Sequence, residues 1–169
     1  MVRLLVIVTA LATLNGALES ASADPSSLSP PAEAHLLLRA VAEGVQIYTC
    51  TAQGSGVAWT LKAPEAVLRD AGGKAVAKHF AGPSWQASDG STVVGEVAAH
   101  ADAPDRNAIP WLLLRAKSHS GAGQFTDIAF IQRIDTVGGL APATGCDPGA
   151  LGNEARIPYS AAYLFYVAR

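Results

Sequence analysis

Histidines and carboxylates are the side chains in this sequence that could carry acid–base chemistry. His79 lies in a distinctive segment, residues 79–85, and a neutral imidazole has the pKa that a general base needs near pH 7. Glu65 and Asp89 lie in neighbouring predicted hairpins, and a carboxylate close to His79 would suit a hydrolase or an isomerase. The structural alternative is that His79 bonds a carbonyl group, Glu65 holds a loop and Asp89 bonds its own turn.

Metal sites and serine nucleophiles have weak signals in the sequence. None of the four histidines takes part in a His-x-His or His-Glu-x-x-His spacing. His100 and Asp102 would share one face of a strand. Ser84 and Ser91 lack the Gly-x-Ser-x-Gly context of a hydrolase nucleophile. We therefore expect no metal and no Ser–His hydrolase.

Trp85 and three polar residues are the candidates for ligand binding. Trp85 follows a Gly-Pro pair, which places it near the rim of the expected sheet, where an exposed indole could stack on a sugar ring or an apolar ligand. Gln46, Tyr48 and Gln132 could line the same cavity with polar groups. Core packing is the alternative for all of the tryptophans.

The composition restricts the possible partners. The chain has 169 residues, a formal net charge of -2 and 15% charged residues. A protein that neutralises nucleic-acid phosphates needs an excess of basic residues, so nucleic acid is not expected as a partner. The mean hydropathy of +0.24 argues against a wholly disordered chain. No apolar run reaches the roughly 18 residues that a membrane-spanning helix needs.

The first 23 residues have the layout of a secretory signal peptide. Arg3 gives a positive start, residues 4–14 are almost wholly apolar, and Ala21-Ser22-Ala23 forms a small-x-small cleavage site. We expect cleavage after Ala23 and export to the periplasm or to the outside of the cell. A buried N-terminal helix and a retained membrane anchor are the alternatives.

Cys50 and Cys146 are the two cysteines of the chain. In an oxidising compartment an even count indicates a disulfide, and two cysteines allow one intramolecular pairing. Such a bridge would close most of the mature chain into one loop, which is the case in which a disulfide stabilises most. Two buried free thiols or a catalytic cysteine paired with a histidine are the alternatives.

Short apolar stretches separated by turns indicate an all-β fold. Residues 45–50 alternate with a period of two, residues 70–73 have the composition of a hairpin turn, and Gly95 marks an expected bulge. We expect Pro64 to end the strand that begins near Val57. About eight or nine strands at this spacing predict one antiparallel β-sandwich or closed β-barrel.

The expected domain organisation has three parts. Residues 1–23 are the signal peptide, residues 24–43 are a lead-in segment, and residues 44–169 form a single β-rich domain. Within the lead-in, residues 32–42 would form a short helix or an extended segment. The tail, residues 161–168, would be a last strand or, because its tyrosines lie near helical spacing, a helix.

Several blocks in a fixed order resemble one known family. The blocks are GVQIYTC at 44–50, APEA at 63–66, HFAGPSWQ at 79–86, DGS at 89–91, IPWLLL at 109–114, and IQR followed by TVGG at 131–139. They resemble a group of secreted bacterial and fungal proteins known only as a domain of unknown function. The resemblance implies export, one compact domain and a Cys50–Cys146 pair, but no reaction.

Some fungal members of that group carry a malate dehydrogenase label. This chain has no Gly-x-Gly-x-x-Gly after a strand and no acidic residue placed for a ribose, so we expect no dinucleotide and no other cofactor.

Three functions are compatible with the sequence. The favoured one is a secreted or periplasmic β-rich module without catalytic activity, which binds a small or glycan-like ligand or a protein partner. The second is a hydrolase or isomerase that uses His79 with Glu65 or Asp89. The third is a structural, envelope-associated protein in which these polar residues are buried and hydrogen-bonded.

Overall fold

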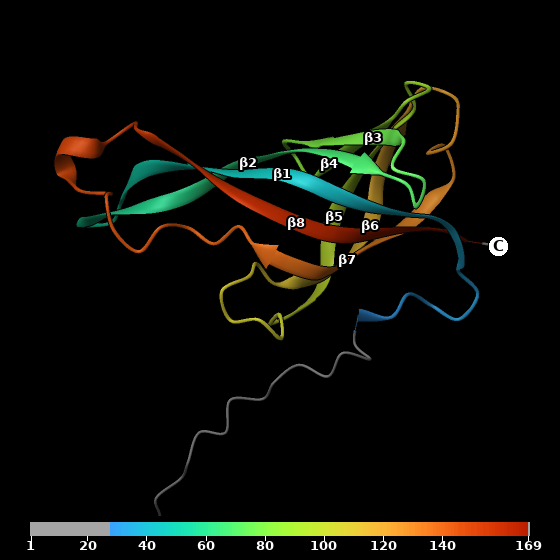
Figure 1. The fold of residues 1–169 in the computed structure, drawn as a ribbon, viewed down its shortest axis with the longest axis horizontal. Helices are drawn as coiled ribbons and strands as arrows, with labels where there is room; N and C mark the ends of the chain where they lie inside the picture. The colour runs from blue at the N-terminus through green and yellow to red at the C-terminus, as the bar shows by residue number, and fades with distance from the viewer. Residues whose placement is uncertain (1–27, 169) are drawn as a thin grey trace, which may run out of the picture.

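The fold is a closed, antiparallel β-barrel of eight strands (Figure 1). The structure is a computed structural model that describes residues 28–168, so the predicted signal peptide lies outside the described residues. The strands are β1 (His35–Gln53), β2 (Gly56–Arg69), β3 (Ala75–Phe80), β4 (Ser84–Ala87), β5 (Thr92–Ala101), β6 (Trp111–Ser120), β7 (Ile128–Gly138) and β8 (Glu154–Val167). Each strand pairs with its neighbour in sequence, and β8 returns to pair with β1. The predicted all-β class is confirmed, and of the two predicted architectures the barrel is the one observed.

Alternation along the strands separates an inner face from an outer face. On β1 the inner positions near the middle of the barrel are small, with Ala40 and Ala42 buried and Gly44 between Ala66 and Tyr159. Large aromatic side chains from β4 and β8 occupy the space that these small residues leave. The interior is therefore a packed core, whose largest fully buried side chains are Trp85, Tyr163, Phe125 and Phe165.

Strands β1, β2 and β8 run beyond the barrel as an arm, at the left of Figure 1. In the arm (residues 48–61 and 153–157), Cys50 of β1 pairs with Trp59 of β2. The chain between β7 and β8 crosses this sheet as a cap segment (residues 138–146). The cap segment is fastened by the Cys50–Cys146 disulfide and by hydrogen bonds from Trp59 Nε1 to the Thr144 carbonyl (2.9 Å) and from the Tyr48 hydroxyl to the Gly139 carbonyl (2.7 Å).

Several local expectations are settled by the strand register. Residues 35–42 are extended within β1, which runs through residue 44 without a break, and the tail is strand β8 rather than a helix. A bulge is present beside Gly95 but on the partner strand: the β5–β6 register passes from Val94–Ser118 to Gly95–Ala116, so the extra residue is Lys117 of β6 and not Gly95. The predicted strand end at Pro64 is wrong. Strand β2 continues through Pro64 to Arg69, and at Pro64 it pairs with β1 alone, since its pairing with β3 starts at Ala66. Proline is tolerated in a strand that has an open edge.

A second, smaller cluster lies on the outside of the barrel. Leu28 is 1% exposed and packs with Ala101 and Leu113, against which Trp111 and Phe130 also pack. The Leu28 carbonyl accepts a hydrogen bond of 2.9 Å from Gln132 Nε2.

Candidate functional site

His79 is a core residue of the barrel. It is 4% exposed, its ring lies parallel to the indole of Trp85, and its Nδ1 is 2.9 Å from the Ser84 carbonyl oxygen. Burial lowers the pKa of the imidazole from 6.5 to about 4, and the bond to Ser84 opposes this shift only in part. The imidazole is therefore neutral at pH 7 and its Nδ1 is engaged by the backbone.

The two carboxylates named with His79 are not placed to act with it. Ala66, the neighbour of Glu65, faces His79 across the β2–β3 pairing, so Glu65 itself points to the opposite, outer face. There Glu65 is exposed and forms an ion pair with Arg156. The structure does not bring Glu65 and His79 together.

Asp89 organises the turn between β4 and β5. Its carboxylate accepts hydrogen bonds from the backbone N–H of Ser91 (2.9 Å), the Ser91 hydroxyl (2.6 Å) and the backbone N–H of Gln124 (2.7 Å). The Ser91 hydroxyl is the main cause of the lowered pKa of Asp89, followed by the Gln124 backbone N–H. Asp89 thus joins two loops that are far apart in sequence, which is a structural role.

The residues expected to bind a ligand are divided between two sides of the sheet. Trp85, Gln46 and Tyr48 are 1%, 2% and 8% exposed and belong to the inner face. Trp85 is therefore not at an exposed rim, because β4 turns its indole into the core. Gln132 lies on the outer face, where it bonds the Leu28 carbonyl and accepts a hydrogen bond from the Tyr166 hydroxyl (3.2 Å). The four residues do not line a common cavity.

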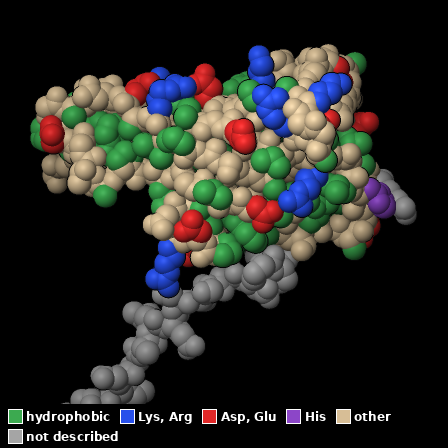
Figure 2. Space-filling view, in the orientation of Figure 1, with side chains coloured by type: hydrophobic (Ala, Val, Ile, Leu, Met, Phe, Trp, Pro, Cys, Tyr) green, Lys and Arg blue, Asp and Glu red, His purple; other side chains and the backbone are tan. Residues whose placement is uncertain are grey.

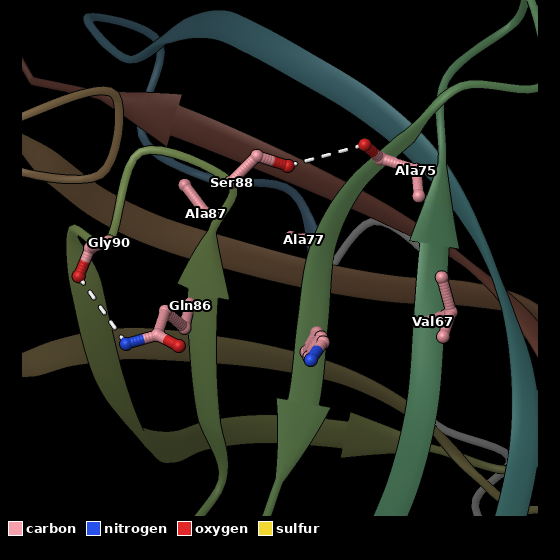
Figure 3. Close-up of a pocket in the computed structure, with 8 residues that line it drawn as sticks. Val67, Ala75, Ala77, Gln86, Ala87, Ser88 and Gly90 are labelled. Atoms are coloured by element: carbon pink, nitrogen blue, oxygen red, sulfur yellow. Dashed lines mark hydrogen bonds between the residues drawn. The ribbon is translucent and has the colours of Figure 1, made fainter.

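An outer groove over β2, β3 and β4 offers space for a ligand (Figure 3). Its volume is about 230 Å³, less than the roughly 300–1,000 Å³ of pockets for drug-sized molecules. This volume suits a molecule smaller than a typical drug. The groove is lined by Val67, Ala75, Ala77, Lys78, Gln86, Ala87, Ser88 and Gly90.

Three polar side chains stand on the apolar lining of this groove. Lys78 and Gln86 are cross-strand partners in the β3–β4 hairpin and are both exposed. Gln86 Nε2 donates two long hydrogen bonds of 3.4 Å, to the Gly90 carbonyl and to Thr92 Oγ1. Ser88 Oγ donates to the Ala75 carbonyl at 3.2 Å (Figure 3). Within residues 28–168, Lys78 forms no ion pair. The groove thus combines a free cation, an amide and a hydroxyl.

Lys78 and Gln86 were missed at the level of sequence, although a signal was present. Each is adjacent to a residue that attracted attention, His79 or Trp85, and therefore faces the other side of its strand. The residues between β3 and β4 include Gly82 and Pro83, a turn composition. Folding the two segments about this turn as a hairpin would have paired Lys78 with Gln86.

The face of the molecule seen in Figure 2 shows no dominant charge. Lys, Arg, Asp and Glu are interspersed over the face in Figure 2. No group of three or more potential metal ligands occurs within the described part of the chain. From residue 28 to residue 168 there is also no helix with the length and apolarity that a membrane crossing requires.

Comparison with known proteins identifies a family but no function. No curated protein and no solved structure shows significant similarity to the chain. One family, described as protein of unknown function (DUF3455), matches residues 30–167, from shortly before β1 to the last residue of β8. The chain therefore belongs to the DUF3455 family.

Proposed function

We propose that this protein is an extracytoplasmic, non-catalytic binding module that holds a small acidic sugar in the groove over β2, β3 and β4. The observation that carries the proposal is the pairing of Lys78 with Gln86 on an apolar floor. A few polar groups that converge on apolar walls are typical of a ligand site.

Each part of the groove matches a part of such a ligand. The Lys78 ammonium would pair with a sugar carboxylate. The groove lining contains no acidic side chain that would compete for Lys78. The Gln86 amide both donates and accepts, as neighbouring ring hydroxyls require. Val67 and the exposed Ala75 would contact the C–H face of the ring, whereas Ala77 and Ala87 point into the core and line the groove only with their backbone. Phe80, 40% exposed and two residues from Lys78 on the same face of β3, extends the apolar surface.

The positions of the other candidates favour binding over catalysis. His79 is buried and bonded to Ser84, and Glu65 lies on the opposite face in an ion pair with Arg156. The burial of His79 also agrees with a structural role for the sequence block that contains it. The groove instead uses Lys78 and Gln86, the outward-facing neighbours of the core residues His79 and Trp85.

The extracytoplasmic location rests on two features. Residues 1–23 have the composition of a signal peptide. The disulfide between Cys50 and Cys146 is compatible with an oxidising compartment. N-terminal sequencing of the exported protein, with Asp24 as the expected first residue, tests this part of the proposal.

Calorimetric titration with uronic acids and with the corresponding neutral sugars tests the ligand. We expect binding of the acidic sugars and at least tenfold weaker binding to the Lys78→Met and Gln86→Leu variants. Lys117, exposed on β6, provides the control, and Lys117→Met should bind as the parent does. The proposal is wrong if no acidic sugar binds, or if Lys78→Met binds with the affinity of the parent.

A further inference from the structure

The outer groove lies on a sheet face that is longer than one sugar. Strand β3 runs from Ala75, which lines the groove, to the exposed Phe80, with Lys78 between them. At about 3.3 Å per residue the strand spans about 17 Å from Ala75 to Phe80, which is longer than a single sugar ring. This face of β3 therefore has room for linked sugars on both sides of Lys78.

Arg69 of β2 borders the groove at its Ala75 end. Arg69 and Ala75 are cross-strand partners. Arg69 also follows two residues after Val67, a second lining residue, on the outer face of β2. Its Nη1 donates a hydrogen bond of 3.0 Å to the Gly73 carbonyl, which holds the guanidinium at the β2–β3 turn. A fixed cation thus lies beside the groove, at the opposite end from Phe80.

The charge at this end of the groove is positive. Lys74 lies in the same turn and is exposed. Within residues 28–168, neither Arg69 nor Lys74 forms an ion pair. The acidic residue of the turn, Asp70, accepts hydrogen bonds from the backbone N–H groups of Gly72 and Lys74. A guanidinium has five N–H groups, so Arg69 keeps donors for an anionic ligand.

The acidic side chains around the groove are occupied or lie to one side of it. Glu65 forms an ion pair with Arg156. The Asp89 carboxylate is directed to the backbone of another loop, where it accepts a hydrogen bond from Gln124. Glu43 lies on β1, on the side of β2 away from β3. The cations of the groove and of the turn are therefore available to a ligand with more than one negative charge.

We propose that the groove is one subsite of a longer surface for an acidic oligosaccharide, with a second subsite at Arg69 and Lys74. The inference rests on the proposed function, in which Lys78 and Gln86 hold the first sugar. Linked uronic acids carry one carboxylate on each ring, so a chain along β3 would present one carboxylate to Lys78 and another to Arg69. The ring of Phe80, 40% exposed, would contact a further sugar. The formal net charge of -2 makes nucleic acid, another polyanion, a poor match.

Calorimetric titration of the full, disulfide-bonded chain with galacturonic acid and with its α-1,4-linked tetramer tests the inference. We expect the tetramer to bind at least tenfold more tightly than the monomer, which exceeds the roughly fourfold gain that four equivalent rings give by statistics. In Arg69→Met/Lys74→Met this ratio should fall to about fourfold or less. Lys74→Met alone, which keeps the bond from Arg69 to the turn, should lower the ratio in part. Arg115→Met, at an exposed position of β6, is the control and should keep the ratio of the parent.

Each contrary result has a separate meaning. A tetramer that gains no more than statistics allow, while galacturonic acid still binds at Lys78, would overturn the inference and leave the proposed function standing. An unchanged ratio in the double variant would overturn the second subsite. Tetraglutamate, a peptide with the same number of side-chain carboxylates, should bind more weakly than the sugar tetramer, and equal affinity would contradict the assignment to a glycan. Absence of binding by both sugars would overturn the proposed function together with this inference.

Discussion

The imidazole of His79 lies flat against the indole of Trp85, with ring centroids 4.4 Å apart and ring planes 1° from parallel. The two residues are cross-strand partners in the β3–β4 hairpin, and both side chains point into the barrel. Tyr163 meets both rings edge-on, at 5.3 Å from His79 and 5.6 Å from Trp85. A potential general base is therefore held as a neutral, stacked ring in the core.

The burial of His79 predicts a dependence of stability on pH. Its pKa is about 4 in the folded state and 6.5 for an unperturbed histidine. Between these values the unfolded chain binds a proton that the folded chain does not, so the free energy of unfolding should fall as the pH drops from 6.5 to 4, by about 3 kcal/mol. Above pH 6.5 the contribution of His79 is complete.

Urea unfolding across this pH range in the parent and in His79→Phe measures the effect. Phenylalanine keeps a flat ring against Trp85 but does not titrate, so the slope should be smaller in this variant. His100→Gln, at an exposed position of β5, should keep the slope of the parent. Equal slopes for the parent and His79→Phe would contradict the burial of a neutral His79.

Loss of the disulfide should destabilise the fold. Cys50 and Cys146 are separated by 96 positions in sequence, and their bridge fastens the cap segment to the arm. Removal of a native disulfide typically costs about 2–5 kcal/mol. Cys50→Ser should lower the melting temperature by several degrees. The double variant Cys50→Ser/Cys146→Ser should melt at about the same temperature as Cys50→Ser, because both lack the bridge. A double variant that melts with the parent under non-reducing conditions would show that the bridge does not stabilise the fold.

The turn before β5 depends on a glycine. Gly90 has a φ of +91°, a conformation that a β-branched residue adopts only with strain. Gly90→Val should therefore cost on the order of 1 kcal/mol or more in chemical denaturation. Gly56, at ordinary negative φ with only the Gln53 carbonyl within 4 Å of an added Cβ, is the control, and Gly56→Ala should change stability little. Similar stabilities for Gly90→Val and the parent would argue against this turn geometry.

Trp85 should contribute to stability and not to ligand binding. Its side chain is 1% exposed, and truncation of a buried tryptophan to alanine costs about 3–5 kcal/mol. Trp85→Ala should lower the free energy of unfolding by an amount of this order. Val97→Ala, at a position 54% exposed, should change it by less than about 0.5 kcal/mol. A mild effect of Trp85→Ala would mean that the indole is not part of the packed core.

Local features of the fold could be predicted from the sequence because they depend on neighbouring residues. Asp70 accepts hydrogen bonds from the backbone N–H groups of Gly72 and Lys74, as the turn composition of residues 70–73 predicts. The pairing of Cys50 with Cys146 was predictable because the chain has two cysteines. In each case a short stretch of sequence or a simple count contains the information.

Features that depend on distant pairing could not be predicted in this way. Closure of the barrel requires β1 to pair with β8 more than a hundred residues away, and no local pattern states that register. The side of the sheet on which Gln132 lies depends on the pairing of β7 with β6 and β8. The groove is a different case, because Lys78 and Gln86 are brought together by the local β3–β4 hairpin, and it was missed because the alternation of inner and outer side chains in that hairpin was not followed.

Two-dimensional ¹H–¹⁵N NMR of the oxidised protein, titrated with a uronic acid, tests the binding proposal most directly. The account predicts concentration-dependent shifts of backbone and side-chain amide signals at Lys78, Gln86 and Ser88, with the signals of exposed β6 residues such as Lys117 unchanged. Unchanged signals at those three groove residues, at sugar concentrations up to tens of millimolar, would contradict it.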